Sequence, residues 1–227
     1  MVKHIRIWVS FVLVLLLTPL AGCGGDDDEK KSDREAGPVE GTFVGKVRDT
    51  EAFAAVVVSP AAGGQDRREV KFYVSDGRRL DEWFRGSVEG ESFDVTSDDR
   101  DAKAKGKVTD KEVTGTIELP DDESVRYQAT RAAATAGLYN LTISDDGEVK
   151  GSSEAGVGLT GESTLPNPGK GTLKLADGKR IEFDIRASGG DSRLRAGRAR
   201  AILLADRQLR GTGKNRDDSA YYIRSSK

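Results

Sequence analysis

The residue types that carry much of protein chemistry are scarce in this chain. Among 227 residues there is one His, His4, and one Cys, Cys23. A zinc site of the usual kind needs several Cys or His ligands, a disulfide needs two Cys, and a Ser-His-Asp site needs a His base. One Cys and one His exclude the disulfide and the zinc site, and loss of His4 with a cleaved N-terminal segment would exclude the His base as well. We expect neither a metal site nor a cofactor.

Carboxylates are abundant, and several are adjacent, such as Asp98-Asp99, Asp121-Asp122 and Asp145-Asp146. Neighbouring residues on a strand point to opposite faces of a sheet, and Asp favours turns, so we interpret these pairs as turn formers. The chain also lacks the nucleophile-elbow, phosphate-loop and calcium-loop motifs. The sequence therefore favours a protein without catalysis of its own, and a hydrolase of cell-wall carbohydrate or peptide that uses scattered carboxylates is the alternative.

The first residues have the pattern of a targeting segment. Lys3 and Arg6 precede an apolar run from Ile7 to Leu17, which Thr18 and Pro19 end. A helix that spans a bilayer needs about 20 apolar residues, and this run is about half as long. Its length and flanking charges are typical of a signal peptide.

The residues that follow, Leu20-Ala21-Gly22-Cys23, resemble the lipobox of bacterial lipoproteins at all four positions. The resemblance implies that residues 1–22 are a signal peptide cut before Cys23, that diacylglycerol joins its thiol and that palmitate-type chains hold the protein on membrane lipid. Two or three acyl chains anchor a protein stably where one does not. The implied location is the extracytoplasmic face of the cell membrane. An ordinary secretory signal that leaves Cys23 a free thiol, or an uncleaved anchor, are the alternatives.

Residues 23–38 are expected to form a linker behind the lipidated Cys23. After Gly24-Gly25 the segment is dominated by charge, with Asp26, Asp27 and Asp28 at its start and no large apolar residue before Val39. Such a composition buries too little surface to offset the entropy of ordering, which predicts a disordered tether. A cation site at the three aspartates is the alternative reading.

The remainder predicts an all-β fold, an antiparallel meander that forms a small β-barrel or two packed β-subdomains, because short alternating stretches are separated by Gly and Asp. Turns are expected at Asp-Gly pairs such as Asp76-Gly77, Asp146-Gly147 and Asp177-Gly178. The expected domains are residues 39–132 and 133–227. The expected strands are Gly41–Val47, Phe53–Ser59, Val70–Ser75, Ser87–Glu91, Phe93–Ser97, Ala102–Val108, Glu112–Leu119 and Val125–Arg131, then Gly137–Ile143, Gly171–Leu175, Ile181–Ala187, Arg193–Leu204, Gln208–Gly213 and Ala220–Arg224.

Two stretches align without gaps, residues 115–130 and residues 171–186. Each contains a Gly-Thr strand, an Asp turn and a return strand, which indicates either an internal duplication or recurrent hairpin chemistry. Residues 151–169 are the least strand-like part of the chain and are expected to form a long exposed loop. Gly106 and Gly115 lie inside expected strands, where they suit the bends of barrel closure.

Leu80, Trp83 and Phe84 are spaced i, i+3 and i+4, which predicts one helical turn with an apolar face. Trp83 and Phe84 are candidate binding residues, since an exposed Trp is an aromatic platform for a sugar or peptide. The alternative is a plug that closes one end of the barrel.

The last 38 residues carry ten basic and four acidic residues. Arg195, Arg198 and Arg200 are candidate binding residues for anionic polymers of the cell envelope, because basic groups near an anionic surface are attracted to it. The alternative is a solvated strand face, since Arg198 and Arg200 alternate with Ala199 and Ala201. Few aromatic residues lie among the arginines, so nucleic acid is not an expected partner.

Three short phrases also resemble a group of uncharacterised actinobacterial secreted proteins and lipoproteins: Tyr73-Val74-Ser75-Asp76-Gly77, Trp83-Phe84-Arg85-Gly86 and Ala136-Gly137-Leu138-Tyr139. That resemblance implies no activity. The leading hypothesis is a lipid-anchored binding or structural module at the cell envelope, with an envelope protein or cell-wall polymer as its partner. The alternatives are the hydrolase and adhesion through the basic C-terminal strands.

Overall fold

The computed structural model describes residues 39–60, 67–119, 123–133, 135–153, 158–163, 169–188 and 195–226. Every regular element in these ranges is a β-strand, which confirms the expected all-β class. The described ranges therefore contain no helix able to cross a membrane. Residues 1–38, including Leu20, Ala21, Gly22 and Cys23, lie outside them.

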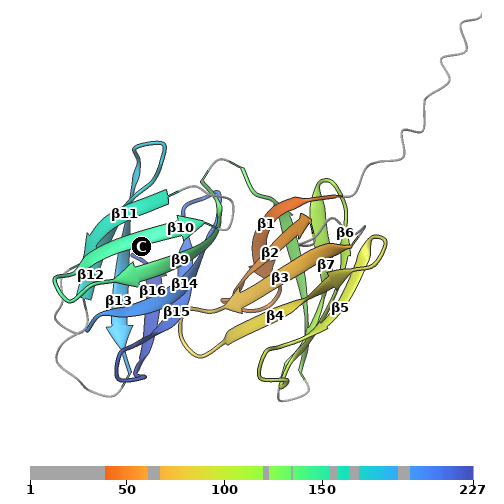
Figure 1. Ribbon diagram of the computed structural model, residues 1–227, viewed down its shortest axis with the longest axis horizontal. Coiled ribbons are helices and arrows are strands. Elements are labelled where there is room, and N and C mark those ends of the chain that lie inside the picture. Colours follow the sequence, from red (N-terminus) through yellow and green to blue (C-terminus); the bar gives the residue numbers. More distant parts are fainter. Residues whose placement is uncertain are drawn as a thin grey trace, which may run out of the picture. The chain divides into compact units, whose positions relative to one another are not determined.

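The first sheet has eight antiparallel strands in the spatial order β4-β3-β2-β1-β8-β7-β6-β5 (Figure 1). Its first and last strands in the sequence are neighbours, with Val44 of β1 opposite Thr130 of β8. Between β4 and β5 there is an isolated bridge, Phe84 to Ser97, and the Asp98 N–H donates to the Trp83 carbonyl at 2.8 Å. The sheet therefore curls almost into a barrel. Its strands are β1 (Gly41–Val47), β2 (Phe53–Pro60), β3 (Arg68–Ser75), β4 (Asp81–Val88), β5 (Ser92–Thr96), β6 (Lys103–Val108), β7 (Glu112–Glu118) and β8 (Ser124–Arg131).

The second sheet is a closed barrel in the order β10-β11-β12-β13-β16-β15-β14-β9. Strand β14 pairs with β9, and β13 pairs with β16, so the chain crosses over once rather than following a simple meander. Full closure leaves no sheet edge, which removes a site of strand-to-strand aggregation. Its strands are β9 (Gly137–Ile143), β10 (Glu148–Ser153), β11 (Gly158–Ser163), β12 (Gly169–Lys174), β13 (Arg180–Ala187), β14 (Gly197–Leu203), β15 (Leu209–Asn215) and β16 (Ala220–Ser225).

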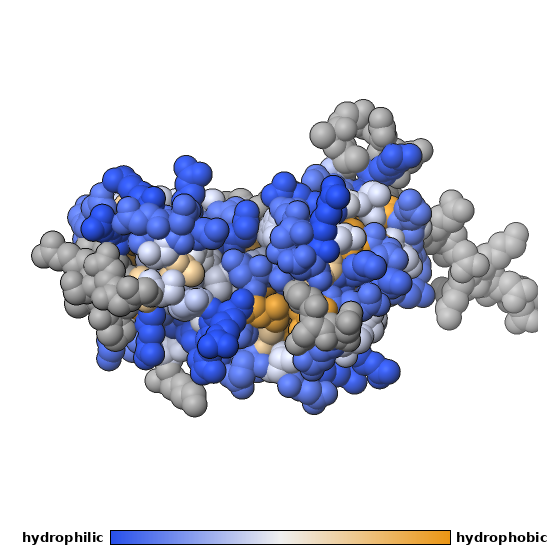
Figure 2. Space-filling view, turned by 90° about the horizontal axis from the view of Figure 1, so that it is seen from below, coloured by the Kyte–Doolittle hydropathy of each residue, from blue (hydrophilic) through white to orange (hydrophobic). Residues whose placement is uncertain are grey.

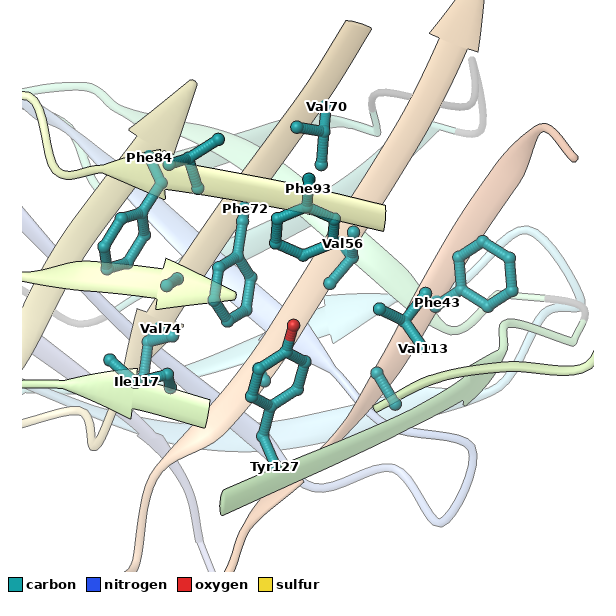
Figure 3. Close-up of a cluster of buried hydrophobic side chains, with 14 of the residues drawn as sticks. Phe43, Val56, Val70, Phe72, Val74, Phe84, Phe93, Val113, Ile117 and Tyr127 are labelled. Atoms are coloured by element: carbon teal, nitrogen blue, oxygen red, sulfur yellow. The ribbon is translucent and has the colours of Figure 1, made fainter. Parts of the chain in front are cut away.

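Aromatic rings fill the core of the first sheet. Phe72 stacks on Phe84 with ring centroids 5.2 Å apart, and Tyr127 lies 4.8 Å from Phe72 on the other side (Figure 3). Gly106 faces this cluster, and a Cβ there would lie 2.4 Å from both the Phe93 ring and the Tyr127 hydroxyl. The glycine thus leaves the space into which the rings pack, in addition to any role in bending β6.

Strand β2 is buried on both faces, unlike the one-sided strands. Ala54, Val56 and Val58 pack into the core of the first sheet. The residues that alternate with them belong to a different apolar cluster on the outer face. Burial on both faces explains why β2 is a continuous apolar run instead of an alternating pattern.

The helical turn expected at Leu80, Trp83 and Phe84 is wrong, because Trp83 and Phe84 belong to strand β4. Consecutive strand residues point to opposite faces. Phe84 enters the core of the first sheet, and Trp83 enters the outer cluster. Two apolar environments on either side of one strand produced a spacing that imitates a helix.

The long loop expected over residues 151–169 is also wrong where the structure describes it. Strand β10 runs to Ser153, β11 spans Gly158–Ser163 and β12 begins at Gly169. These strands pair with one another and close the barrel. Val149 is the one large apolar side chain of β10, so the sequence alternates too weakly there to indicate a strand.

The two aligned stretches form hairpins of the same register. Gly115 lies opposite Tyr127 in the β7–β8 pair, and Gly171 lies opposite Phe183 in the β12–β13 pair. Beyond these hairpins the connections differ, since β8 pairs with β1 whereas β13 pairs with β16. The similarity is therefore local to the hairpin.

Candidate functional site

Apolar residues from both sheets meet in one cluster, which we call the intersheet core. Its members on the first sheet lie on β1 to β4, and its members on the barrel side lie on β9 and at the end of β14. Burial of this apolar surface holds the two sheets together. The intersheet core consists of Val44, Phe53, Ala55, Val57, Tyr73, Trp83, Leu138, Ile202 and Leu204.

Trp83 is 8% exposed and is covered by charged and aromatic neighbours. The Arg200 guanidinium lies over its ring at 4.4 Å from the centroid, and Arg85 lies at 5.7 Å. The Tyr73 ring packs beside it at 5.7 Å. Arg200 of β14 thus covers one face of the Trp83 ring on β4. The two residues therefore contribute to the contact between the sheets, and this ring face is not open to a ligand.

The other candidate residues lie apart from one another. Phe84 is fully buried on the opposite face of β4. Arg195 pairs with Asp217 at 3.0 Å, and Arg198 is exposed on β14. The structure therefore does not gather Arg195, Arg198 and Arg200 into a single site.

The adjacent acids that the structure describes bond within turns or to nearby strands. Asp99 accepts a hydrogen bond from Ser97, which lowers the pKa of its carboxyl, and Asp98 pairs with Arg85 at 3.4 Å. Asp146 accepts a hydrogen bond from the Ser144 hydroxyl.

Asp145 accepts a hydrogen bond from the Ala196 N–H at 2.9 Å. The pair Asp121-Asp122 lies outside the described residues. Within the described ranges, no three His, Cys, Asp or Glu side chains are arranged to hold a metal ion.

Glu82 of β4 is a buried acid that no sequence motif marks. It is 9% exposed, and its Oε2 has no hydrogen-bond partner within the described residues. Burial, followed by the charge of Asp99, raises the pKa of Glu82 to about 7 from 4.5. It lies on β4 beside the seam with β5, which isolated bridges join in place of a continuous strand ladder.

A groove of about 1450 Å³ has elements of both sheets in its wall, and we call it the arginine groove. Its seven arginines outnumber its four acids, so a local excess of positive charge faces the groove. The arginines are Arg78, Arg79, Arg180, Arg186, Arg207, Arg210 and Arg224, and the acids are Glu51, Glu182, Asp184 and Asp206. Hydrophilic side chains also dominate the face of the molecule shown in Figure 2.

Two of the groove arginines are direct cross-strand neighbours. Arg210 of β15 lies opposite Arg224 of β16. Both approach one carboxylate, that of Glu51, at 3.9 Å from Arg210 and 3.5 Å from Arg224. Because the Glu51 side chain is 70% exposed and these contacts are long, each pair contributes little.

Arg210 is the more buried of the two, with its side chain 11% exposed. Its guanidinium donates to the Leu209 carbonyl at 2.9 Å and stacks over the Phe53 ring at 5.0 Å. Burial, and then the charge of Arg224, lowers its pKa. A guanidinium remains charged under such a shift, so a buried positive charge persists here.

The turn at Gly77 packs against the stems of both arginines. A Cβ at Gly77 would lie 2.8 Å from the Ile223 carbonyl oxygen, 3.0 Å from Arg224 Cγ and 3.1 Å from Arg210 Cδ. Its φ of 67° also favours glycine. The Asp76-Gly77 turn of the first sheet therefore positions a pair of barrel arginines.

In the sequence, Arg210 and Arg224 are two of the ten basic residues of the C-terminal region, and no local motif distinguishes them. Their proximity depends on the register of β15 with β16. The alternating arginines of β14 were the more visible signal, but they do not line the groove.

No known protein family model, curated protein or solved structure matches this chain.

Proposed function

We propose that the protein is a binding module held on the extracytoplasmic face of the cell membrane by acylated Cys23, with the arginine groove as its binding site. The lipobox residues Leu20, Ala21, Gly22 and Cys23 support the anchor. The linker of residues 24–38 spans up to about 50 Å when extended, so it is long enough to hold the module away from the bilayer.

The observation that carries the binding function is the groove itself. Ligand sites are concave and hold a few convergent polar groups. The groove brings together arginines from the Asp76-Gly77 turn, from β13 and from the β15–β16 pair. A purely structural module has no need for such a concentration of like charge.

The two alternatives receive less support from the geometry. Adhesion through the exposed basic strands relies on Arg195, Arg198 and Arg200, of which Arg195 pairs with Asp217 and Arg200 covers Trp83. Hydrolysis by carboxylates relies on acids such as Asp99 and Asp146, whose described contacts lie within turns.

The anchor is tested by Cys23→Ala. We expect the variant to lose palmitate labelling and to leave the membrane fraction, whereas Ser32→Ala in the same segment changes neither. A Cys23→Ala protein that remains in the membrane fraction contradicts the lipid anchor.

The groove is tested by retention of the protein on purified cell-envelope material. Arg186→Glu with Arg207→Glu places two acids on the groove wall, and we expect it to lose retention and to remove much of its dependence on salt. Arg198→Glu with Lys214→Glu makes the same charge change outside the groove. Loss of retention only in this second variant would instead support adhesion through the exposed strands.

A further inference from the structure

We infer that Arg210 and Arg224, with Arg78 beside them, form a phosphate site, and that the ligand of the arginine groove is a phosphorylated sugar or polyol. The inference rests on the proposed function and adds the class of ligand to it. Three observations carry it: two arginines directly opposite each other on neighbouring strands, a buried guanidinium with an unused donor, and the mixed charge of the surrounding wall.

The positive charge of the arginine pair is only partly compensated. Asp184 of β13 lies opposite Arg224 on the side away from Arg210, and Asp76 and Glu51 act on Arg210. Like charges directly opposite on neighbouring strands destabilise a sheet. Arg210 and Arg224 occupy such positions, and the charge of Arg78 also acts on Arg210. The exposed Glu51 is the one described carboxylate that pairs with either guanidinium, and it serves both. A dianionic group between the guanidiniums would replace this repulsion by attraction.

Part of the hydrogen-bonding capacity of the pair is unused. Arg210 Nε has no hydrogen-bond partner within the described residues, and the Arg210 contact with the Ser225 hydroxyl is long, at 3.4 Å. An unused donor on a buried charged group is costly. Arg224 is 27% exposed, so its guanidinium is accessible from the groove.

Stacking on Phe53 explains part of the burial of Arg210 but not the whole arrangement. A structural cation–π contact requires Arg210 alone, whereas Arg224 has no described aromatic partner and still lies opposite it. The contact with Gly77 positions both stems from one turn. A substitution of Arg224 therefore distinguishes a ligand site from a purely structural contact.

The chemistry of the pair and its wall indicates the ligand. Planar guanidinium groups bind phosphate oxygens in bidentate fashion. The groove volume of about 1450 Å³ leaves room for more than a phosphate. The wall also holds Glu182, Asp184 and Asp206, whose oxygens accept hydrogen bonds from hydroxyl groups, and Asp184 lies directly beside Arg224. In a phosphorylated sugar or polyol, the phosphate would bind the arginines, and the hydroxyl groups would donate hydrogen bonds to the acids.

The inference is tested by isothermal titration calorimetry on the full chain with glycerol 3-phosphate, glucose 1-phosphate, inorganic phosphate and glucose. We expect saturable binding of the two phosphate esters, weaker binding of inorganic phosphate and none of glucose. Arg224→Gln should weaken ester binding by tenfold or more, since a charge-assisted pair is lost. Glu51→Gln should strengthen it several-fold, because the competing carboxylate is removed.

Arg216→Gln is the matched control, because Arg216 is an exposed barrel arginine that pairs with Asp145 outside the groove. We expect its ester affinity to equal that of the parent. Circular dichroism checks that each variant is folded. If Arg224→Gln does not fold, Arg224→Lys and Arg78→Gln replace it, and each should still weaken ester binding.

Several outcomes overturn the inference. No saturable binding of either ester, or equal losses in Arg224→Gln and Arg216→Gln, removes the phosphate site. Retention on envelope material that depends on Arg186 and Arg207 without ester binding overturns the ligand class and leaves the proposed function standing. Binding of Cys23→Ala protein to phosphatidylglycerol vesicles, without binding of the soluble esters, assigns the phosphate to a lipid headgroup instead.

Discussion

The Tyr73 hydroxyl oxygen lies 2.8 Å from the Thr212 Oγ1, and this hydrogen bond joins β3 of the first sheet to β15 of the barrel. Both side chains are buried, and Tyr73 belongs to the intersheet core. Burial, and then the charge of Asp81, raises the pKa of Tyr73, so the phenol stays neutral. Thr212 lies two residues from Arg210 on β15, so this bond between the sheets is close along the strand to an arginine of the groove.

Tyr73→Phe should lower the free energy of unfolding by about 1–3 kcal/mol, because the variant leaves the buried Thr212 hydroxyl without its Tyr73 partner. Urea denaturation measures the change. Acrylamide quenching of Trp83 should rise, since Tyr73 packs beside Trp83 across the same contact.

Tyr127→Phe is the control for this prediction. The Tyr127 hydroxyl donates to the Lys105 carbonyl at 3.2 Å within the first sheet, away from the intersheet core. We expect its removal to leave the quenching of Trp83 unchanged. Equal quenching in both variants would contradict a role of Tyr73 in joining the sheets.

Trp83 should emit as a buried tryptophan. In a full-length chain with Trp8→Phe, Trp83 is the remaining tryptophan, and we expect blue-shifted emission and weak quenching by acrylamide. Arg200→Ala uncovers the ring face and should increase quenching, whereas Arg198→Ala, which changes an exposed arginine two residues earlier on β14, should not. Red emission with strong quenching in the Trp8→Phe chain would instead support an open aromatic platform.

Glu82 predicts a specific dependence of stability on pH. The folded protein holds this carboxyl with a pKa of about 7, above the ordinary 4.5, so the folded state binds the proton more tightly than the unfolded state. The contribution of Glu82 to stability is full below about pH 4.5, falls as the pH rises toward 7 and is constant above it, with a total loss of up to about 3 kcal/mol.

Glu82→Gln removes this titration, and we expect the variant to be more stable than the parent at pH 8 and to lose that fall between pH 5 and 7. Urea denaturation at several pH values measures both effects. Glu89→Gln, in the exposed turn after β4, is the control and should leave the pH profile as it is. A parent protein whose stability does not fall over this range contradicts the buried, protonated Glu82.

The sequence predicted strands well where alternation and turn chemistry act together. Gly77, Gly147 and Gly178 of the three expected Asp-Gly turns adopt positive φ, as tight turns require. Strands β1 and β9 have the bounds expected from their sequences. In β8 the buried residues alternate with exposed ones, so one face of the sheet was visible in the sequence.

The failures have physical causes as well. Strand β4 packs against two apolar clusters, so Trp83 and Phe84 are both buried and the period of two is hidden. The pairing of Arg210 with Arg224 depends on a strand register, and the contact of Gly77 with their stems depends on how the two sheets pack. Both contacts join residues far apart in the sequence, so the spacing of residues along the chain does not predict the groove.

Gly106→Ala should destabilise the first sheet by about 1–3 kcal/mol, because its Cβ would overlap the Phe93 ring and the Tyr127 hydroxyl and force these packed groups to move. Gly137→Ala is the matched control: it also lies in a strand, its φ is not in the left-handed region, and the nearest atoms to its Cβ are 3.8 Å away. We expect that control to be neutral or slightly stabilising. Urea denaturation compares the two, and equal stabilities would mean that Gly106 serves backbone bending rather than ring packing.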